Sequence, residues 1–259
     1  MTALLDVDNI GIRFGGLKAV DGLSLRLQPG DLQGLIGPNG AGKTTCFNLL
    51  TGVYTPDTGD VRLAGRSLLK LRPYQITQAG IARTFQNIRL FGHLSVLDNL
   101  KVACHLRTKQ TLFGTIARST FGRREEAAID HKCRTLLERF DLRARADDPA
   151  SSLPYGDQRR LEIARALATD PKVLLLDEPA AGMNPHEKVQ LKGLIAKVLA
   201  DFPVAILLIE HDMGVVMGLC RHITVVDHGT VIATGEPAAI QQNPKVIEAY
   251  LGVPEERGN

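Results

Sequence analysis

The N-terminal part of the chain alternates short apolar and polar stretches, separated by glycine or proline residues. Residues 23–27, LSLRL, alternate one by one, and turn-forming pairs lie at residues 15–16 (GG) and 29–30 (PG). Alternation with a period of two, broken by turn residues, is typical of antiparallel strands. We therefore expect an N-terminal antiparallel β subdomain over residues 4–27, with a further hairpin at residues 60–65.

Later in the chain, short and mostly apolar runs replace this alternation. They cover residues 32–36, 173–176, 204–209 and 223–226. Such runs are expected where a parallel sheet is covered on both faces. Helix-like stretches at residues 43–50 and 161–168 alternate with them. Asn184, Pro185 and Glu187 then supply the cap, the first-turn proline and the third-position acid of another helix. This order predicts an α/β fold with a mostly parallel core sheet.

Between residues 106 and 145, apolar positions recur at helical spacing among many arginine, lysine and glutamate side chains. These positions are Ala128, Ile129, Cys133, Leu136, Leu137 and Phe140. Ser95 and Asp98, three residues apart, have the spacing of a capping box that opens a helix. We therefore expect a single domain over residues 1–259, with a helical subdomain at about residues 88–165.

The composition limits the class of protein. With 44% hydrophobic and 23% charged residues, the 259-residue chain has the composition of a globular protein. Its longest apolar runs are far shorter than the ~20 residues of a membrane-spanning helix, so we expect any membrane association to be peripheral. The N-terminus lacks the basic and apolar regions of a secretory signal, which favours a cytoplasmic protein.

Cysteine spacing and net charge exclude further classes. Cys46, Cys104, Cys133 and Cys220 include no Cys-x-x-Cys pair, so the sequence indicates neither a zinc site nor a disulfide framework. The formal net charge of +3 is small, whereas phosphate-driven binding usually requires a concentrated basic face. We therefore expect no nucleic-acid partner.

The strongest chemical signal is a glycine loop that follows the run at residues 32–36 and fits G-x-x-x-x-G-K-[ST]. Its residues are Gly37, Pro38, Asn39, Gly40, Ala41, Gly42, Lys43 and Thr44, with Thr45 next in the nucleotide-binding segment. Backbone N–H groups of such a loop wrap a phosphate at a helix N-terminus. Lys43 would reach the β- and γ-phosphates, and Thr44 would ligate Mg²⁺. A glycine turn with a solvated lysine is the alternative, which the flanking strand and helix disfavour.

Two carboxylates, Asp177 and Glu178, follow the apolar run at residues 173–176. Ligands of open α/β sheets bind beyond the carboxyl ends of the strands. Asp177 is expected to hold Mg²⁺ through water, and Glu178 to deprotonate the attacking water. An acidic helix cap is the alternative. The occurrence of this pair together with a glycine loop favours a nucleotide phosphohydrolase or transferase.

Residues 153–167, LPYGDQRRLEIARAL, distinguish between these classes. They resemble the signature of the ABC ATPases and its following helix, and the resemblance extends over nearly the whole chain. Gln86 lies in the position of the family's Q-loop glutamine, residues 181–184 in that of the D-loop, and His211 in that of the switch histidine. Phe14 occupies the place of the adenine-stacking aromatic, with packing in the core as an equal alternative.

The resemblance implies that ATP and Mg²⁺ bind between two such domains, with the glycine loop of one facing the signature of the other. Tyr155, Gly156 and Asp157 would then contact the nucleotide held by the partner domain. Gln86 would sense Mg²⁺ and the attacking water and would touch a transmembrane subunit. His211 would contact the γ-phosphate.

Three positions depart from the family pattern. Pro154 stands where serine is usual, Asp157 where glutamine is usual, and Asn184 where the D-loop has aspartate. Proline has no hydroxyl for an opposing phosphate. We therefore expect a signature function that is weakened but retained through the backbone of Tyr155 and Gly156. Asn184 is expected to cap its helix.

Further segments resemble one branch of the family, the Liv-type ATPases of branched-chain amino-acid importers. They are residues 82–91, 177–185, 209–213 and 243–252. This branch implies two membrane permease subunits and a second ABC ATPase subunit, either a paralogue or a second copy of the chain. It also implies an extracytoplasmic substrate-binding protein without direct contact, and a peripheral position at the cytoplasmic face of the inner membrane. An importer of urea, an amide or another amino acid, and a non-transport ABC ATPase, are the alternatives.

Overall fold

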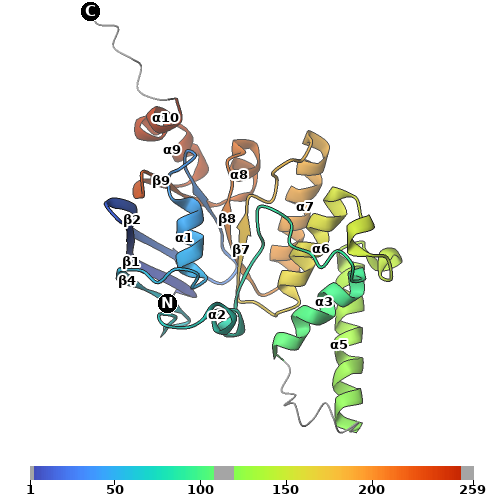
Figure 1. Ribbon diagram of the computed structural model, residues 1–259. Coiled ribbons are helices and arrows are strands. Elements are labelled where there is room, and N and C mark those ends of the chain that lie inside the picture. The colour runs from blue at the N-terminus through green and yellow to red at the C-terminus, as the bar shows by residue number, and fades with distance from the viewer. Residues whose placement is uncertain (1–2, 108–119, 252–259) are drawn as a thin grey trace, which may run out of the picture. The chain divides into compact units, whose positions relative to one another are not determined.

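The computed structural model describes residues 3–107 and 120–251, and its contacts divide the chain into two units (Figure 1). The first unit joins residues 1–83 to residues 172–259, and the second consists of residues 84–171. The second unit is therefore an insertion in the sequence of the first. Among the described helices, none is long and apolar enough to span a membrane.

The N-terminal residues form an antiparallel sheet with the strand order β2-β1-β4-β5. The strands are β1 (Leu5–Phe14), β2 (Leu17–Leu27), β4 (Thr58–Leu63) and β5 (Arg66–Ser67). Alternate residues of β2, such as Leu23 and Leu27, are buried, as the period-two pattern predicts. Ala64 and Gly65, both at positive φ, form the turn between β4 and β5. The expected antiparallel subdomain is confirmed, and its second hairpin is longer than expected.

The other sheet of the first unit has the strand order β10-β9-β3-β8-β7-β6. The strands are β3 (Leu32–Ile36), β6 (Ile81–Arg83), β7 (Val173–Asp177), β8 (Ala205–Ile209), β9 (His222–Asp227) and β10 (Thr230–Gly235). Neighbours are parallel except for β10, which pairs antiparallel with β9. Every residue of β7 and β8 is buried, so these apolar runs are confirmed as strands covered on both faces.

Helix α1 (Lys43–Leu50) lies between the two sheets and carries the glycine loop at its N-terminus (Figure 1). Phe47 and Leu50 are fully buried in a core that includes residues of both sheets. Burial of each of these side chains contributes roughly 1.5–3 kcal/mol. The position of the loop is therefore fixed by a helix that is packed on both sides.

The remaining helices of the first unit cover its sheets. They are α2 (Pro73–Ala79), α7 (Pro185–Asp201), α8 (Met213–Leu219), α9 (Pro237–Gln241) and α10 (Pro244–Leu251). Helix α7 packs through Leu191, Ile195 and Val198, which are spaced by three or four residues. Asp212 caps α8, because its side chain accepts a hydrogen bond from the Val215 N–H. This cap fixes the chain that leaves β8.

The second unit contains the helices expected in the insert. They are α3 (Val96–Cys104), α5 (Thr120–Arg139) and α6 (Tyr155–Leu167), with short 3₁₀ helices at His105–Arg107, Arg143–Arg145 and Ala150–Ser152. The apolar positions of α5 from Cys133 onward are buried, whereas Ala128 is exposed. Cys104 Sγ on α3 and Cys133 Sγ on α5 lie 3.6 Å apart as free thiols. Sequence spacing did not indicate this proximity.

Helix α3 begins after Ser95 as expected, with a cap that differs from a full capping box, and helix α6 begins earlier than expected. Ser95 Oγ accepts a hydrogen bond from the Asp98 N–H at 3.0 Å and donates one to the Asp98 carboxylate at 2.7 Å. The acid thus contacts the hydroxyl, rather than the Ser95 N–H as in a full capping box. Helix α6 begins at Tyr155 instead of residue 161. Its first turns are polar, so they lack the apolar period that marks a helix in a sequence.

Candidate active site

The glycine loop leaves β3 and enters α1 through backbone conformations that require glycine. The φ angles of Gly37 and Gly42 are +156° and +98°. A Cβ atom on Gly37 would lie 2.0 Å from the Val226 carbonyl oxygen, and one on Gly42 would lie 2.4 Å from the Ala19 carbonyl oxygen. Neither position has room for a side chain. The first turn of α1 that follows offers N–H groups without partners inside the helix, the arrangement that binds phosphate.

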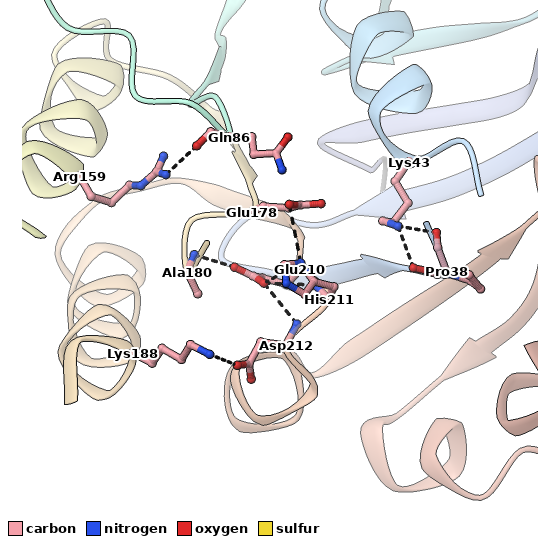
Figure 2. Close-up of polar contacts among 11 residues, drawn as sticks. Pro38, Lys43, Gln86, Arg159, Glu178, Ala180, Lys188, Glu210, His211 and Asp212 are labelled. Atoms are coloured by element: carbon pink, nitrogen blue, oxygen red, sulfur yellow. Dashed lines mark hydrogen bonds and ion pairs between the residues drawn. The ribbon is translucent and has the colours of Figure 1, made fainter. Parts of the chain in front are cut away.

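Lys43 lies inside this loop, with only 6% of its surface exposed. Its Nζ donates hydrogen bonds to the carbonyl oxygens of Gly37 at 2.7 Å and Pro38 at 2.8 Å (Figure 2). Burial lowers the pKa of the Lys43 ammonium, and the carboxylates of Glu178 and Asp177 oppose that shift. The ammonium is therefore held beside the loop and within the electrostatic field of both acids.

Asp177 ends β7, and its side chain is 6% exposed. Arg83, at the end of β6, donates from Nη2 to Asp177 Oδ2 at 2.6 Å. The same guanidinium donates from Nη1 to Asn48 Oδ1 of α1 at 2.8 Å. The sequence assigned no role to Arg83. In the sequence, Arg83 is only a basic residue after two apolar ones. Its partner Asp177 is 94 residues away, so the sequence does not indicate the ion pair.

Glu178 follows β7 in a left-handed backbone conformation, with φ +44°. Non-glycine residues rarely adopt this region, and such strain is concentrated at functional sites. Its N–H donates to the Ile209 carbonyl oxygen at 2.9 Å, which ties the turn to the end of β8. Its carboxylate Oε2 lies 3.6 Å from His211 Nδ1. The two candidate catalytic side chains thus meet beyond adjacent strands.

Glu210 is a buried residue with no role predicted from the sequence. Its carboxylate accepts hydrogen bonds from the N–H groups of Ala180 at 2.7 Å, His211 at 3.1 Å and Asp212 at 3.3 Å (Figure 2). Burial raises the pKa of Glu210, and these hydrogen bonds oppose that shift. Lys188 Nζ donates a hydrogen bond to Asp212 Oδ2 at 2.6 Å. One buried acid therefore connects the segment after β7 to the segment that carries the histidine.

Asn184 caps α7, as expected. Its Oδ1 accepts from the Glu187 N–H at 3.0 Å, and Glu187 Oε2 accepts from the Asn184 N–H at 2.9 Å, which completes a capping box. The side chain is thus engaged in the start of its own helix.

Replacing Asn184 with alanine is expected to lower the free energy of unfolding by about 1 kcal/mol, because the cap is lost. ATP affinity should be unchanged. Urea denaturation and a nucleotide titration measure the two quantities, and Gln190→Ala, on an exposed position of the same helix, is the control. A loss of ATP binding without a loss of stability would contradict this assignment.

The signature segment forms the start of α6 in the second unit. Pro154 is the N-cap residue, with no side-chain hydrogen bond to the helix, and Tyr155 is 41% exposed. Gly156 and Asp157 are half-buried, and Asp157 Oδ1 lies 3.9 Å from Arg160 Nη1. The first turn of a helix of this length carries N–H groups that can bind an anion without a serine hydroxyl.

Gln86 is exposed in a loop whose backbone is attached to α6. Arg159 donates to the carbonyl oxygens of Phe85 at 2.7 Å and Gln86 at 2.9 Å, and to Glu162 at 2.7 Å. Glu162 accepts from the Phe85 and Arg89 N–H groups, both at 3.3 Å. The Arg159 and Glu162 side chains are 0% and 1% exposed. The ion pair of Arg159 and Glu162 was not predicted from the sequence. The only indication of it there is two opposite charges three residues apart in a helix.

Phe14 lies at the end of β1 and is 45% exposed, so it is not a core residue. Its ring meets the ring of Tyr54 edge to face, with centroids 5.2 Å apart. Tyr54, which the sequence did not single out, thus supports the exposed ring.

At one edge of the parallel sheet, the structure brings together the glycine loop, both acids and the histidine. Lys43 follows β3, Asp177 and Glu178 lie at the end of β7, and His211 follows β8. These strands are neighbours in the order β3-β8-β7, and ligands of α/β sheets bind at this edge. The Q-loop glutamine and the signature segment belong to the second unit.

The donors at this edge fit a magnesium ion that is also bound to phosphate. Over residues 3–107 and 120–251, no group of three or more His, Cys, Asp or Glu side chains could hold a metal. In nucleotide sites Mg²⁺ typically uses one or two protein ligands together with substrate phosphates. Asp177 and the exposed Thr44 beside the loop can provide them.

Comparison with known proteins identifies the family. The sequence model of the ABC transporter family matches residues 20–181, and that of the branched-chain amino acid ATP-binding cassette transporters matches residues 230–256. The high-affinity branched-chain amino acid transport ATP-binding protein LivG of Escherichia coli strain K12 is 50% identical over 250 residues, covering 96% of this chain and 98% of LivG. The corresponding protein BraF of Pseudomonas aeruginosa is 46% identical over the same shares.

Solved structures agree with this match. The crystal structure of the ADP conformation of an ATP-binding cassette of an ABC transporter is 32% identical, with a TM-score of 0.84 over 98% of this chain and 100% of that chain. A nucleotide-free cassette gives a TM-score of 0.83 at 31% identity, over 97% and 100%. The expected fold class is confirmed. The chain therefore belongs to the ABC transporter family, as an ATP-binding and ATP-hydrolysing cassette of the branch that contains LivG and BraF.

Proposed function

We propose that this ATPase hydrolyses Mg·ATP to power the uptake of branched-chain amino acids through partner permease subunits. The convergence of Lys43, Asp177 and Glu178 at the sheet edge carries the ATPase chemistry. The solute is taken from LivG and BraF, whose names describe branched-chain amino acid transport. The match of residues 230–256 to a family named for the same solute supports this choice.

Phosphate binding is assigned to the glycine loop. Lys43 Nζ exchanges the carbonyl oxygens of Gly37 and Pro38 for oxygens of the β- and γ-phosphates. Residues 39–42 and Thr45 supply the backbone around the phosphates at the N-terminus of α1.

Contacts to the metal and to the adenine ring complete the nucleotide site. Thr44 and, through water, Asp177 would hold Mg²⁺, and Gln86 would provide a further oxygen. The bound metal supplies positive charge that offsets the charge developing on the phosphates. Phe14, half-exposed and supported by Tyr54, stacks on the adenine ring.

Hydrolysis is assigned to Glu178 and His211. Glu178 takes the proton of the water that attacks the γ-phosphate, a role worth roughly 10²–10⁴ in rate. His211, whose Nδ1 lies 3.6 Å from the Glu178 carboxylate, contacts the γ-phosphate. Glu210 accepts hydrogen bonds from the N–H groups of Ala180 and His211. The segments that carry Glu178 and His211 therefore keep their relative position.

Coupling to transport requires a second ABC ATPase subunit, either a paralogue or another copy of this chain. Tyr155, Gly156 and Asp157 contact the nucleotide of that partner, so ATP favours the closed pair because it gains contacts there. The chain acts as one domain over residues 1–259 with a helical subdomain at about residues 88–165, and residues 86–91 dock on two permease subunits. The assembly lies at the cytoplasmic face of the inner membrane, and an extracytoplasmic protein delivers the solute without touching the ATPase.

Replacing Lys43 with alanine is expected to weaken ATP binding at least about tenfold, because charge-assisted bonds to the phosphates are lost. Cells that carry only this variant should lose uptake of labelled leucine and keep uptake of urea and glutamate. The measurements are a nucleotide titration of the purified chain and uptake assays of the three solutes.

The control is Lys197→Ala, on an exposed position of α7, which should leave both quantities unchanged. Loss of urea or glutamate uptake instead of leucine uptake would replace the proposed solute and keep the ATPase. Normal uptake of every solute by cells carrying Lys43→Ala would contradict the transport role.

A further inference from the structure

Arg83 contacts two other parts of the nucleotide site within the first unit. It ends β6, and its Nη2 donates to Asp177 Oδ2 at 2.6 Å. Its Nη1 donates to Asn48 Oδ1 at 2.8 Å, and the guanidinium carbon lies 5.4 Å from the centre of the Phe47 ring. Asn48 and Phe47 belong to α1, the helix that carries the glycine loop. Arg83 therefore ties the metal-binding acid to that helix.

The ion pair is buried, with the Arg83 side chain 8% and the Asp177 side chain 6% exposed. A buried carboxylate is unfavourable unless an opposite charge and hydrogen bonds compensate it. The parallel pairing of β6 and β7 fixes the geometry, because Arg83 lies opposite Leu175, two residues before Asp177. Strand register, and not a flexible surface contact, thus sets the position of the arginine.

We propose that Arg83 is a positioning residue that compensates the charge of Asp177, so that the triphosphate can bind before Mg²⁺ joins it. This inference rests on the proposed function, which puts Asp177 beside Mg·ATP. Without the arginine, the carboxylate and the γ-phosphate repel each other, and the repulsion is strong where the effective dielectric constant is well below that of water. The repulsion is offset once Mg²⁺ is bound, so Arg83 matters most when the metal is absent.

The test compares the affinity of a non-hydrolysable ATP analogue in excess EDTA with its affinity in millimolar Mg²⁺. Arg83→Gln should weaken binding about tenfold in EDTA and leave binding in Mg²⁺ nearly unchanged. Arg83→Lys keeps the positive charge and should retain most of the affinity in EDTA. The matched control is Arg62→Gln, which breaks an ion pair with Asp60 on the antiparallel sheet and should change neither affinity.

A double variant separates the charge effect from misfolding. Arg83→Gln/Asp177→Asn removes both charges and with them the repulsion, so this double variant should bind the analogue in EDTA about as tightly as the unmodified chain. Removing both partners of a buried ion pair is also far less disruptive than removing one. The comparison therefore remains informative even if Arg83→Gln alone does not fold.

Equal weakening of binding in EDTA and in Mg²⁺ by Arg83→Gln would overturn the inference, as would clearly weaker binding in EDTA by Arg83→Gln/Asp177→Asn than by the unmodified chain. Lys43→Ala in the same assay separates this result from the proposed function. If the unmodified chain binds the analogue and Lys43→Ala does not, such a result rejects the role of Arg83 alone. If the unmodified chain does not bind the analogue at all, the proposed function fails and the inference fails with it.

Discussion

Replacing Glu178 with glutamine is expected to reduce ATP turnover by about 10²–10⁴-fold while ATP binding is nearly unchanged. Glutamine has the same size and can still accept a hydrogen bond, but it cannot take a proton from the attacking water. Glu178 follows a fully buried strand and its N–H is bonded to Ile209, so the amide should occupy the place of the carboxylate. Phosphate release, measured at saturating ATP beside a nucleotide titration, gives both quantities.

The control for this experiment is Glu126→Gln, on an exposed position of α5 in the second unit, which makes the same chemical change outside the sheet that carries Glu178. Its turnover should equal that of the unmodified chain. Turnover by Glu178→Gln at more than about one tenth of the normal rate would mean that another group is the base. An equal fall in turnover and ATP affinity would instead indicate that Glu178 shapes the binding site.

Replacing Arg159 with methionine is expected to lower the free energy of unfolding of the helical unit by about 3–5 kcal/mol. Methionine fills much of the same space but leaves Glu162 buried without its positive partner. The carbonyl oxygens of Phe85 and Gln86 also lose their donors, which releases the loop that carries the candidate metal-sensing glutamine. Urea denaturation followed by circular dichroism measures the loss.

The double variant Arg159→Met/Glu162→Gln tests the reason for this loss. Its neutral amide can still accept the hydrogen bonds from the Phe85 and Arg89 N–H groups, so stability should recover relative to Arg159→Met alone. If Arg159→Met stays within about 1 kcal/mol of the unmodified chain, the pair does not stabilise the unit as the burial of its charges predicts.

The sequence predicted the parts of the fold whose signals are local. The apolar runs that became β7 and β8 are fully buried, and the glycine loop leads into α1 as its motif requires. The short strand β6 was missed because three residues carry no period, and β10 because its residues are exposed or half-buried. The start of α6 was placed too late because its first turns are polar.

Residues that depend on distant partners could not be recognised in the same way. The hydrogen bond between Arg83 and Asp177 joins positions 94 residues apart in the sequence. Glu210 is identifiable only through the N–H groups that converge on it, one of them from Ala180. A charged residue in a sequence is normally read as exposed, and only the fold shows that its charge is buried and compensated.

The strand order also constrains when this chain can first bind a nucleotide. β3, which leads into the glycine loop, pairs on one side with β8 and on the other with β9, with Leu32 opposite Ile206 and Gln33 opposite His222. A ribosome releases β3 long before either neighbour, and pairing over such long sequence separations forms late in folding. Unpaired strand edges promote aggregation in the meantime. A functional phosphate loop therefore requires synthesis to have passed β9, since a truncated chain that ends before β8 lacks both strands that hold β3 in place.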